Sequence, residues 1–199
     1  MTLAVFLDRD GTILDELGYL TPASTIHVYP YSADAIRLLS RGGYRVVVIT
    51  NQGGIGLGMY DRAFVDWTHA RLAEQFESGG AHVDGWYYCP HHPNATVAEF
   101  KHACDCRKPA TGLVTAAARD LNIDLTASWV VGDQWRDIEL ARRAGARSIL
   151  VRTGYGKGLE ANWPEGIAPP TVVSDNLMSA TAYILGSGDC RESREVSEG

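Results

Sequence analysis

The clearest pattern along the chain is an alternation of short apolar runs with longer stretches whose apolar residues recur at helical spacing. Four short runs are rich in β-branched residues; they span residues 3–7, 45–50, 128–132 and 147–151. Runs of this length are too short for buried helices. We therefore expect them to form the buried strands of a parallel sheet.

Helical patterns lie between and after these runs, and most of them close on glycine; they span residues 32–43, 61–80, 112–122 and 134–145. Such alternation predicts an α/β fold, a three-layer Rossmann-like parallel sheet with helices on both faces. Weaker patterns add a strand at 85–89, a late edge strand at 171–175 and a final helix near 176–185.

The composition is that of an ordinary globular protein, with 45% hydrophobic and 21% charged residues in 199. We expect one domain over residues 1–186, followed by a disordered tail at 187–199 that lacks apolar residues to bury. Cys190 lies in this tail and is given no role.

The net charge of -6 gives no general basic surface for nucleic acid, so an anionic ligand must be held by a local site. No apolar stretch is long enough to span a bilayer, and the N-terminus lacks the order of a signal peptide. We expect a cytoplasmic monomer with no nucleic acid and no membrane as partner.

Polar residues follow three of the predicted strands, namely Asp8 and Asp10, Thr50 and Asn51, and Asp133. In open parallel sheets, ligands bind at the carboxyl ends of the strands. Asp8 and Asp10 are one residue apart, so in an extended segment both carboxylates point the same way and repel each other. A divalent cation, a phosphoryl group or a solvated turn each explains the pair. An aspartate alone also caps helices, but the joint placement favours a site.

Four motifs taken in order resemble those of the haloacid dehalogenase superfamily of phosphatases: DRDGT, VVVITNQ, RKP and VVGDQWRD. The match runs from residue 3 to about residue 155. The resemblance implies that Asp8 is a nucleophile that forms an aspartyl-phosphate, and that Asp10 is the general acid and then the general base. Thr50 and the backbone at Asn51 would hold phosphate oxygens. Lys108 would offset the charge of the transferred group, although a lone lysine is usually a surface residue.

The site also offers only hard oxygen ligands, which suit Mg²⁺. These ligands would be the carboxylates of Asp8 and Asp133 and the backbone carbonyl of Asp10, with Asp137 supporting the metal from one turn later.

A cluster of cysteines and histidines predicts a second metal site. In a reducing compartment such a cluster favours metal over disulfide, although free buried thiols are the alternative. The set that we expect to hold a structural zinc is Cys89, His91, Cys104 and Cys106, with His92 and His102 as alternative histidine ligands. This zinc would fix a long irregular loop and the Arg107–Lys108 pair that follows it.

The segments CPHHP, CDCRKP and TNQGGIGLG, with no large inserted cap domain, look like the D-glycero-D-manno-heptose-1,7-bisphosphate 7-phosphatases. The resemblance implies that Arg107 recognises the distal part of a bisphosphate. It further implies a substrate site lined by Glu16, Leu17, Gly18, Tyr19, Asn51, Gln52 and Gly53. Residues 18–24 and 53–58 are candidate flaps over this site. Gln134 departs from the family, which often carries lysine at this position. Loss of that lysine would weaken binding of a second phosphate or shift the anomer preference.

The sequence thus predicts a Mg²⁺-dependent phosphatase that acts on a small sugar phosphate. Histidinol-phosphate phosphatases share a similar zinc loop, so histidinol phosphate is an alternative substrate. A phosphotransferase and a non-catalytic binding protein of the same fold are further alternatives. The second is disfavoured because every motif residue is intact.

Overall fold

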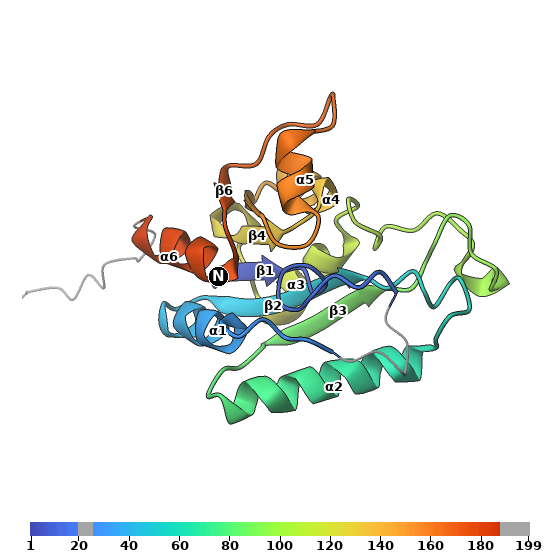
Figure 1. The fold of residues 1–199 in the computed structure, drawn as a ribbon, viewed down its shortest axis with the longest axis horizontal. Helices are drawn as coiled ribbons and strands as arrows, with labels where there is room; N and C mark the ends of the chain where they lie inside the picture. Colours follow the sequence, from blue (N-terminus) through green and yellow to red (C-terminus); the bar gives the residue numbers. More distant parts are fainter. Residues whose placement is uncertain (20–25, 188–199) are drawn as a thin grey trace, which may run out of the picture.

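The structure is a computed structural model that describes residues 1–19 and 26–187. These residues contain a parallel sheet of six strands in the order β3-β2-β1-β4-β5-β6 (Figure 1). The strands are β1 (Ala4–Leu7), β2 (Arg45–Asn51), β3 (Gly85–Cys89), β4 (Trp129–Gly132), β5 (Arg147–Val151) and β6 (Val172–Ser174). The predicted parallel sheet is confirmed, including the strand at 85–89 and the late edge strand.

The helices follow the strands in the expected alternation. They are α1 (Ser32–Arg41), α2 (Arg62–Ser78), α3 (Gly112–Leu121), α4 (Trp135–Ala144), α5 (Gly156–Ala161) and α6 (Leu177–Gly186), with the short 3₁₀ helices η1 (Ala98–Phe100) and η2 (Leu125–Ala127). The sequence did not predict α5, because GKGLEA contains two glycines and one large apolar residue.

Helices cover both faces of the sheet, which confirms the three-layer expectation. Apolar residues of α1, α2 and α6 pack on one face, and those of α3 and α4 pack on the other. The four residues of β1 divide between the two cores: Val5 and Leu7 face the first, and Ala4 and Phe6 face the second. All four are fully buried, as expected for a central strand covered on both sides.

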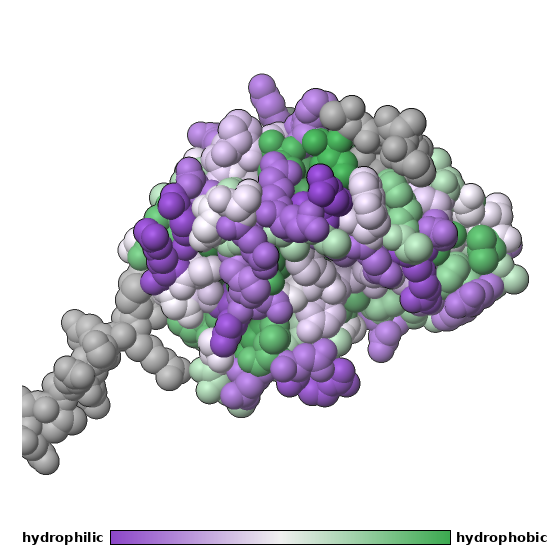
Figure 2. All heavy atoms as spheres, turned by 90° about the horizontal axis from the view of Figure 1, so that it is seen from below, coloured by the Kyte–Doolittle hydropathy of each residue, from purple (hydrophilic) through white to green (hydrophobic). Residues whose placement is uncertain are grey.

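α2 illustrates how the pattern of the sequence becomes packing. Its side chains at Val65, Leu72 and Phe76 are buried at helical spacing. The helix begins after Asp61, whose carboxylate accepts a hydrogen bond from the Phe64 N–H at 2.8 Å. Seen from below, the surface is hydrophilic over most of its area, with smaller hydrophobic patches between (Figure 2). Within the described ranges, no helix combines the length and apolarity needed to cross a membrane.

The strand order brings distant parts of the chain to one edge of the sheet. β1 lies between β2 and β4, so the chain leaves β1 toward β2 on one side and later places β4 on the other. Crevices at the carboxyl ends of strands form at such points. Asp8, Thr50 and Asp133 all lie at the carboxyl ends of these three strands. The predicted tail lies almost wholly outside the described residues, as do positions 20–24 of one candidate flap.

Candidate active site

Asp8 follows β1 directly and is almost fully buried. Its backbone N–H donates to the Val131 carbonyl at 2.9 Å, which ties it to β4. Its Oδ1 accepts from the Arg9 N–H at 2.7 Å and lies 2.8 Å from Lys108 Nζ. Burial raises the pKa of Asp8 to about 7, against the opposing effect of Lys108. A nucleophilic carboxylate at this place therefore needs further positive charge to stay ionised at neutral pH.

Lys108 is a buried lysine that faces several acceptors. Its Nζ lies 2.8 Å from Asp8 Oδ1 and 2.7 Å from Asp137 Oδ1, and it donates to the Ile49 carbonyl at 3.1 Å. Burial alone would lower the pKa of Lys108, but the Asp137 and Asp8 carboxylates outweigh it and raise the pKa above its ordinary value. Lys108 is therefore a fixed positive charge beside Asp8, in contrast to the surface lysine that is the usual case.

The loop that carries Lys108 is fixed to the end of β2. The Lys108 N–H donates to Asn51 Oδ1 at 3.0 Å, and Asn51 Nδ2 donates back to the Lys108 carbonyl at 3.2 Å. This reciprocal pair uses the Asn51 side chain to position the loop. The Gln52 N–H in turn donates to the Cys89 carbonyl at 2.8 Å, which ties the chain after β2 to the end of β3.

Asp133 follows β4, is fully buried and is held in a narrow space. Its Oδ2 accepts from the Tyr155 N–H at 2.8 Å. Gly11 and Gly154, both with positive φ, approach this carboxylate so closely that a Cβ at either position would overlap it. Among the residues that the structure describes, its Oδ1 has no hydrogen-bond partner. A buried carboxylate oxygen without a donor is destabilising unless a cation binds there.

A divalent cation fits this group of carboxylates. One oxygen from each of Asp8, Asp133 and Asp137 lies within 4.8 Å of the others. Burial raises the pKa of Asp133 to about 8, and the neighbouring Asp8 and Asp137 add to this rise. The carboxylates of Asp8 and Asp133 are hard oxygen donors, and the free Asp133 Oδ1 is an open ligand position.

Asp137 differs from the other two carboxylates because both of its oxygens already face the protein. Its Oδ2 accepts from the Gln134 N–H at 3.1 Å, and its Oδ1 is in ion-pair contact with Lys108. These contacts fit the predicted role of Asp137 in supporting the metal better than a role as a direct ligand.

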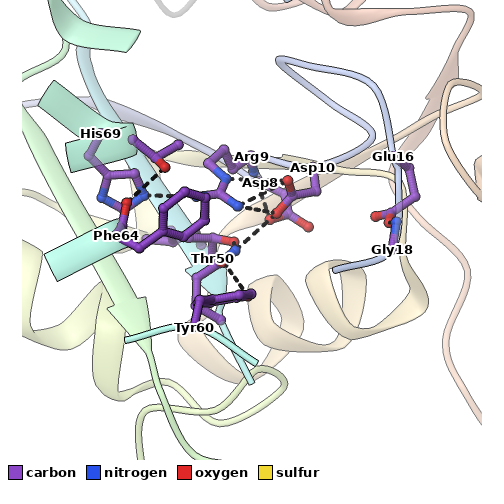
Figure 3. Close-up of polar contacts among 12 residues, drawn as sticks. Asp8, Arg9, Asp10, Glu16, Gly18, Thr50, Tyr60, Phe64 and His69 are labelled. Carbon is purple, nitrogen blue, oxygen red and sulfur yellow. Dashed lines mark hydrogen bonds and ion pairs between the residues drawn. The ribbon is translucent and has the colours of Figure 1, made fainter. Parts of the chain in front are cut away.

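Asp10 lies in a network of side-chain hydrogen bonds (Figure 3). Arg9, which is 1% exposed, contacts both carboxylate oxygens of Asp10, with Nη2 at 3.0 Å from Oδ2. Gln52 Nε2 donates to the same Oδ2 at 3.0 Å and to Thr50 Oγ1 at 2.9 Å. Thr50 can still donate its own hydroxyl proton to an acceptor in the cavity.

A cavity of about 250 Å³ opens beside these groups. Of the residues predicted for catalysis or for substrate binding, those that line it are Asp8, Asp10, Glu16, Gly18, Tyr19, Thr50, Asn51, Gln52, Gly53, Arg107, Lys108 and Gln134. Leu17 is the exception: it is 49% exposed and faces a neighbouring hollow. The Gly18 N–H donates to Glu16 Oε1 at 2.6 Å, and this turn directs Leu17 outward.

Three further residues line the cavity that the sequence did not single out, namely Tyr60, Arg136 and Tyr155. Arg136 lies two residues after Gln134 on the first turn of α4, so its position within the fourth motif could have identified it as a cavity residue. Tyr60 ends the glycine-rich loop. Its ring fills the space above Gly54, and its hydroxyl donates to Gln52 Oε1 at 2.9 Å.

Two arginines form the positive part of the cavity wall. Arg107 Nη1 donates to the His91 carbonyl at 2.7 Å, and the Arg136 guanidinium lies 5.1 Å from the centre of the Trp135 ring. Among the described residues, no carboxylate lies within ion-pair distance of either guanidinium. Both charges therefore remain available to an anion.

The predicted cysteine and histidine set lies together in the segment between β3 and α3. The ligand atoms of Cys89, His91, Cys104 and Cys106 lie within 4.8 Å of one another. His91 Nδ1 is 3.2 Å from Cys106 Sγ and 3.5 Å from Cys89 Sγ. The three cysteines are free thiols, and a closed Cys₃His set of this kind is compatible with a structural zinc.

The two alternative histidines lie outside this group. The His102 ring packs edge-on against the His91 ring at 4.4 Å, and His92 Nδ1 accepts from the Asn94 N–H at 3.1 Å. The glycine-rich loop packs on the same segment, since the Gly56 N–H donates to the Pro90 carbonyl at 3.1 Å. The cysteine and histidine group therefore lies next to the cavity, with Arg107 and Lys108 directly after Cys106.

Comparison with known proteins agrees with this geometry. Residues 105–180 match the family model described as HAD-hydrolase-like. The D-glycero-β-D-manno-heptose-1,7-bisphosphate 7-phosphatase of Photorhabdus laumondii is 41% identical over 163 residues, which cover 79% of this chain and 85% of that protein. The enzyme of the same name from Escherichia coli K12 is 41% identical over 156 residues, covering 76% and 80%.

Among solved structures, the D,D-heptose 1,7-bisphosphate phosphatase of B. bronchiseptica, complexed with magnesium and phosphate, is similar with a TM-score of 0.82. It is 31% identical, and the alignment covers 94% of this chain and 99% of that one. The similarity therefore extends over nearly the whole of both chains.

Proposed function

The chain belongs to the haloacid dehalogenase superfamily, in the family of the heptose bisphosphate phosphatases, and is a phosphoric monoester hydrolase; we propose that its substrate is D-glycero-D-manno-heptose 1,7-bisphosphate. The bond cleaved is that of the C7 phosphate. This function is supported by the convergence of Asp8, Lys108 and Asp133 from separate parts of the chain: Asp8 and Lys108 line the cavity, and a carboxylate oxygen of Asp133 lies within 4.8 Å of one of Asp8.

Asp8 is the nucleophile in this proposal. Its carboxylate attacks phosphorus, the bond from phosphorus to the C7 oxygen breaks, and the leaving oxygen takes a proton from Asp10. In the second step Asp10 takes a proton from a water molecule, which attacks the aspartyl-phosphate. Inorganic phosphate leaves, and the Asp8 carboxylate and the Asp10 acid are restored.

The remaining groups bind the phosphoryl oxygens. The Thr50 hydroxyl and the backbone at Asn51 would bind phosphoryl oxygens in the cavity that both residues line, and Lys108 supplies positive charge beside Asp8. Asp8, Asp133 and the carbonyl of Asp10 would hold Mg²⁺, which offsets the charge of the phosphoryl group. The orphaned Asp133 Oδ1 supports this assignment.

A bisphosphate needs a second positive site, and Arg107 and Arg136 fit that need. Both line the cavity, and neither has a carboxylate partner in the described part of the chain. Gln134 supplies no charge here. Arg136 places a cation two residues further along α4, so the distal phosphate still has two guanidinium groups to bind it.

The cysteine and histidine group would hold Zn²⁺ in a structural role. Four protein ligands leave no open position for substrate, so the zinc would take no part in the reaction. Its effect would be to fix the segment that presents Arg107 and Lys108 to the cavity.

A substrate panel tests the proposal. Heptose 1,7-bisphosphate in its α and β forms, the heptose 7-phosphate and histidinol phosphate are compared at saturating Mg²⁺. We expect kcat/KM to be highest for a bisphosphate, because only that substrate engages both Lys108 and the two arginines. A preference for histidinol phosphate, which carries a cationic amine instead of a second phosphate, would assign the alternative function.

A further inference from the structure

The buried arginine between the two site aspartates has a demanding set of contacts. Arg9 is 1% exposed, so each of its N–H groups needs an acceptor inside the protein. Nε and Nη2 face Asp10 Oδ1 at 3.3 and 3.1 Å, and Nη2 also faces Oδ2 at 3.0 Å. This fork-like contact fixes the orientation of the Asp10 carboxylate relative to the guanidinium.

The remaining guanidinium nitrogen points away from the cavity toward α2. Arg9 Nη1 lies 3.3 Å from Nε2 of His69, a residue 60 positions later in the chain (Figure 3). His69 is 6% exposed and is stacked on Trp86 with ring centres 4.8 Å apart; Tyr88 packs edge-on at 5.8 Å. The imidazole is therefore held by β3 on one side and faces Arg9 on the other.

The protonation state of His69 suits an acceptor. Burial, aided by the charge of Arg9, lowers the pKa of His69 to about 3, so the ring is neutral at physiological pH. A neutral imidazole can leave Nε2 unprotonated and accept the N–H of Arg9 there. In the described part of the chain, the carboxylate paired with Arg9 is that of Asp10.

Asp10 is held from a second direction as well. Gln52 Nε2 donates to its Oδ2 at 3.0 Å, and the Tyr60 hydroxyl donates to Gln52 Oε1 at 2.9 Å. Burial raises the pKa of Tyr60 to about 12, which keeps this hydroxyl protonated as a donor. Two chains of contacts thus meet at one carboxylate, one from α2 and one from the glycine-rich loop.

We infer that His69 is a positioning residue of the phosphatase reaction, which acts through Arg9 to hold the Asp10 carboxylate where it exchanges a proton with the leaving oxygen and then with water. The inference rests on the proposed function, because it takes Asp10 as the general acid and base. Misplacement of a catalytic group by about 1 Å can lower a rate ~100-fold, so the acceptor at His69 affects kcat although it lies away from the cavity.

The test compares variants that keep or remove the acceptor. His69→Gln supplies an amide oxygen for Arg9, whereas His69→Leu has similar bulk and no acceptor. Thr68→Val is the matched control, since Thr68 is the adjacent buried residue of α2 and its hydroxyl donates to the Phe64 carbonyl at 2.8 Å. Each is assayed in single turnovers with the heptose bisphosphate and with p-nitrophenyl phosphate, whose leaving group needs no protonation.

We expect His69→Leu to lower the rate of leaving-group release from the bisphosphate ~10- to 100-fold with little change in KM. The release of p-nitrophenolate should fall less than ~3-fold, because proton donation by Asp10 contributes little there. His69→Gln should stay within ~3-fold of the wild type on both substrates, as should Thr68→Val. If His69→Leu does not fold, His69→Asn replaces it as the variant without an acceptor for Arg9. The asparagine side chain is one methylene shorter than that of glutamine, so its amide oxygen falls short of the guanidinium.

Three outcomes would overturn the inference. These are an unchanged bisphosphate rate in His69→Leu, an equal loss on both substrates, and a failure of glutamine to restore the rate that leucine removes. A wild-type protein that hydrolyses neither ester with Mg²⁺ present would instead refute the proposed function, so the two failures are distinguishable.

Discussion

In the proposed mechanism, single residues at the carboxyl ends of β1, β2 and β4 would carry the chemistry, and glycines make room for one of them, Asp133. Asp133 lies between Gly11 and Gly154, both of which have positive φ, and neither has space for a Cβ. The positions of Asp8, Thr50 and Asp133 at strand ends could be predicted from the sequence, because each follows apolar residues of a predicted strand. The role of Gly154 could not be recognised from the sequence, because Gly154 follows β5 and Asp133 follows β4, and the two residues meet only in the folded sheet.

Gly154→Ala tests the fit of this carboxylate. The added Cβ would displace Asp133, so we expect kcat to fall ~100-fold or more and the Mg²⁺ concentration for half-maximal activity to rise. Gly166→Ala is the control, since Gly166 also has positive φ but has open space around its Cβ position. Gly166→Ala should lose about 1 kcal/mol of stability in urea unfolding because of its positive φ, and Gly154→Ala should lose more, because its Cβ also overlaps Asp133. Equal activities of the two variants would show that Asp133 need not lie where the structure places it.

Arg136 is the residue whose importance depends on the substrate. Arg136→Gln removes a cation from the cavity wall and leaves Asp8 and its partners untouched. We expect KM for the bisphosphate to rise ~10- to 100-fold, and KM for p-nitrophenyl phosphate to change less than ~3-fold. Arg119→Gln on α3, an exposed arginine outside the cavity, is the control. An unchanged KM for the bisphosphate would place its distal phosphate elsewhere.

At the scale of elements, the sequence was most informative where a face is continuously apolar. The strand at 147–151 was predicted with its observed bounds, because buried parallel strands are nearly uniform in hydrophobicity. The edge strand at 85–89 was also predicted with its observed bounds, although four of its five residues are only half-buried. The short helix α5 has no such signal. The link from α2 to Asp10 was also beyond the sequence, because His69 reads as an ordinary buried residue until the fold places it beside Arg9.

Loss of one cysteine in the segment between β3 and α3 tests whether the cysteine and histidine group holds zinc. Cys106→Ser removes one of four ligands, so the purified variant should contain little zinc, and its Tm should fall by ~6–12 °C for a loss of ~3 kcal/mol. Activity at saturating Mg²⁺ should also fall, because Lys108 lies two residues later. Retained zinc, or a wild-type protein purified without chelators that contains none, would contradict the assignment.

For the molecule as a whole, the strand order is the feature that produces the site. β1 and β4 are neighbours in the sheet although more than a hundred residues separate them in the chain, so Asp8 and Asp133 meet only in the complete fold. The net charge of -6 makes the surroundings unfavourable for a phosphate ester. In the proposed mechanism, binding would therefore depend on Lys108, Arg107, Arg136 and a bound cation.

In the proposed mechanism Asp8 attacks phosphorus, and the turnover of an Asp8→Asn variant measures its part in the reaction. The amide is nearly isosteric but has no charge and is a poor nucleophile, so kcat/KM on the heptose bisphosphate at saturating Mg²⁺ should fall by at least ~10⁴-fold. Circular dichroism should show an unchanged fold. A folded Asp8→Asn protein with turnover within ~10-fold of the wild type would contradict the account.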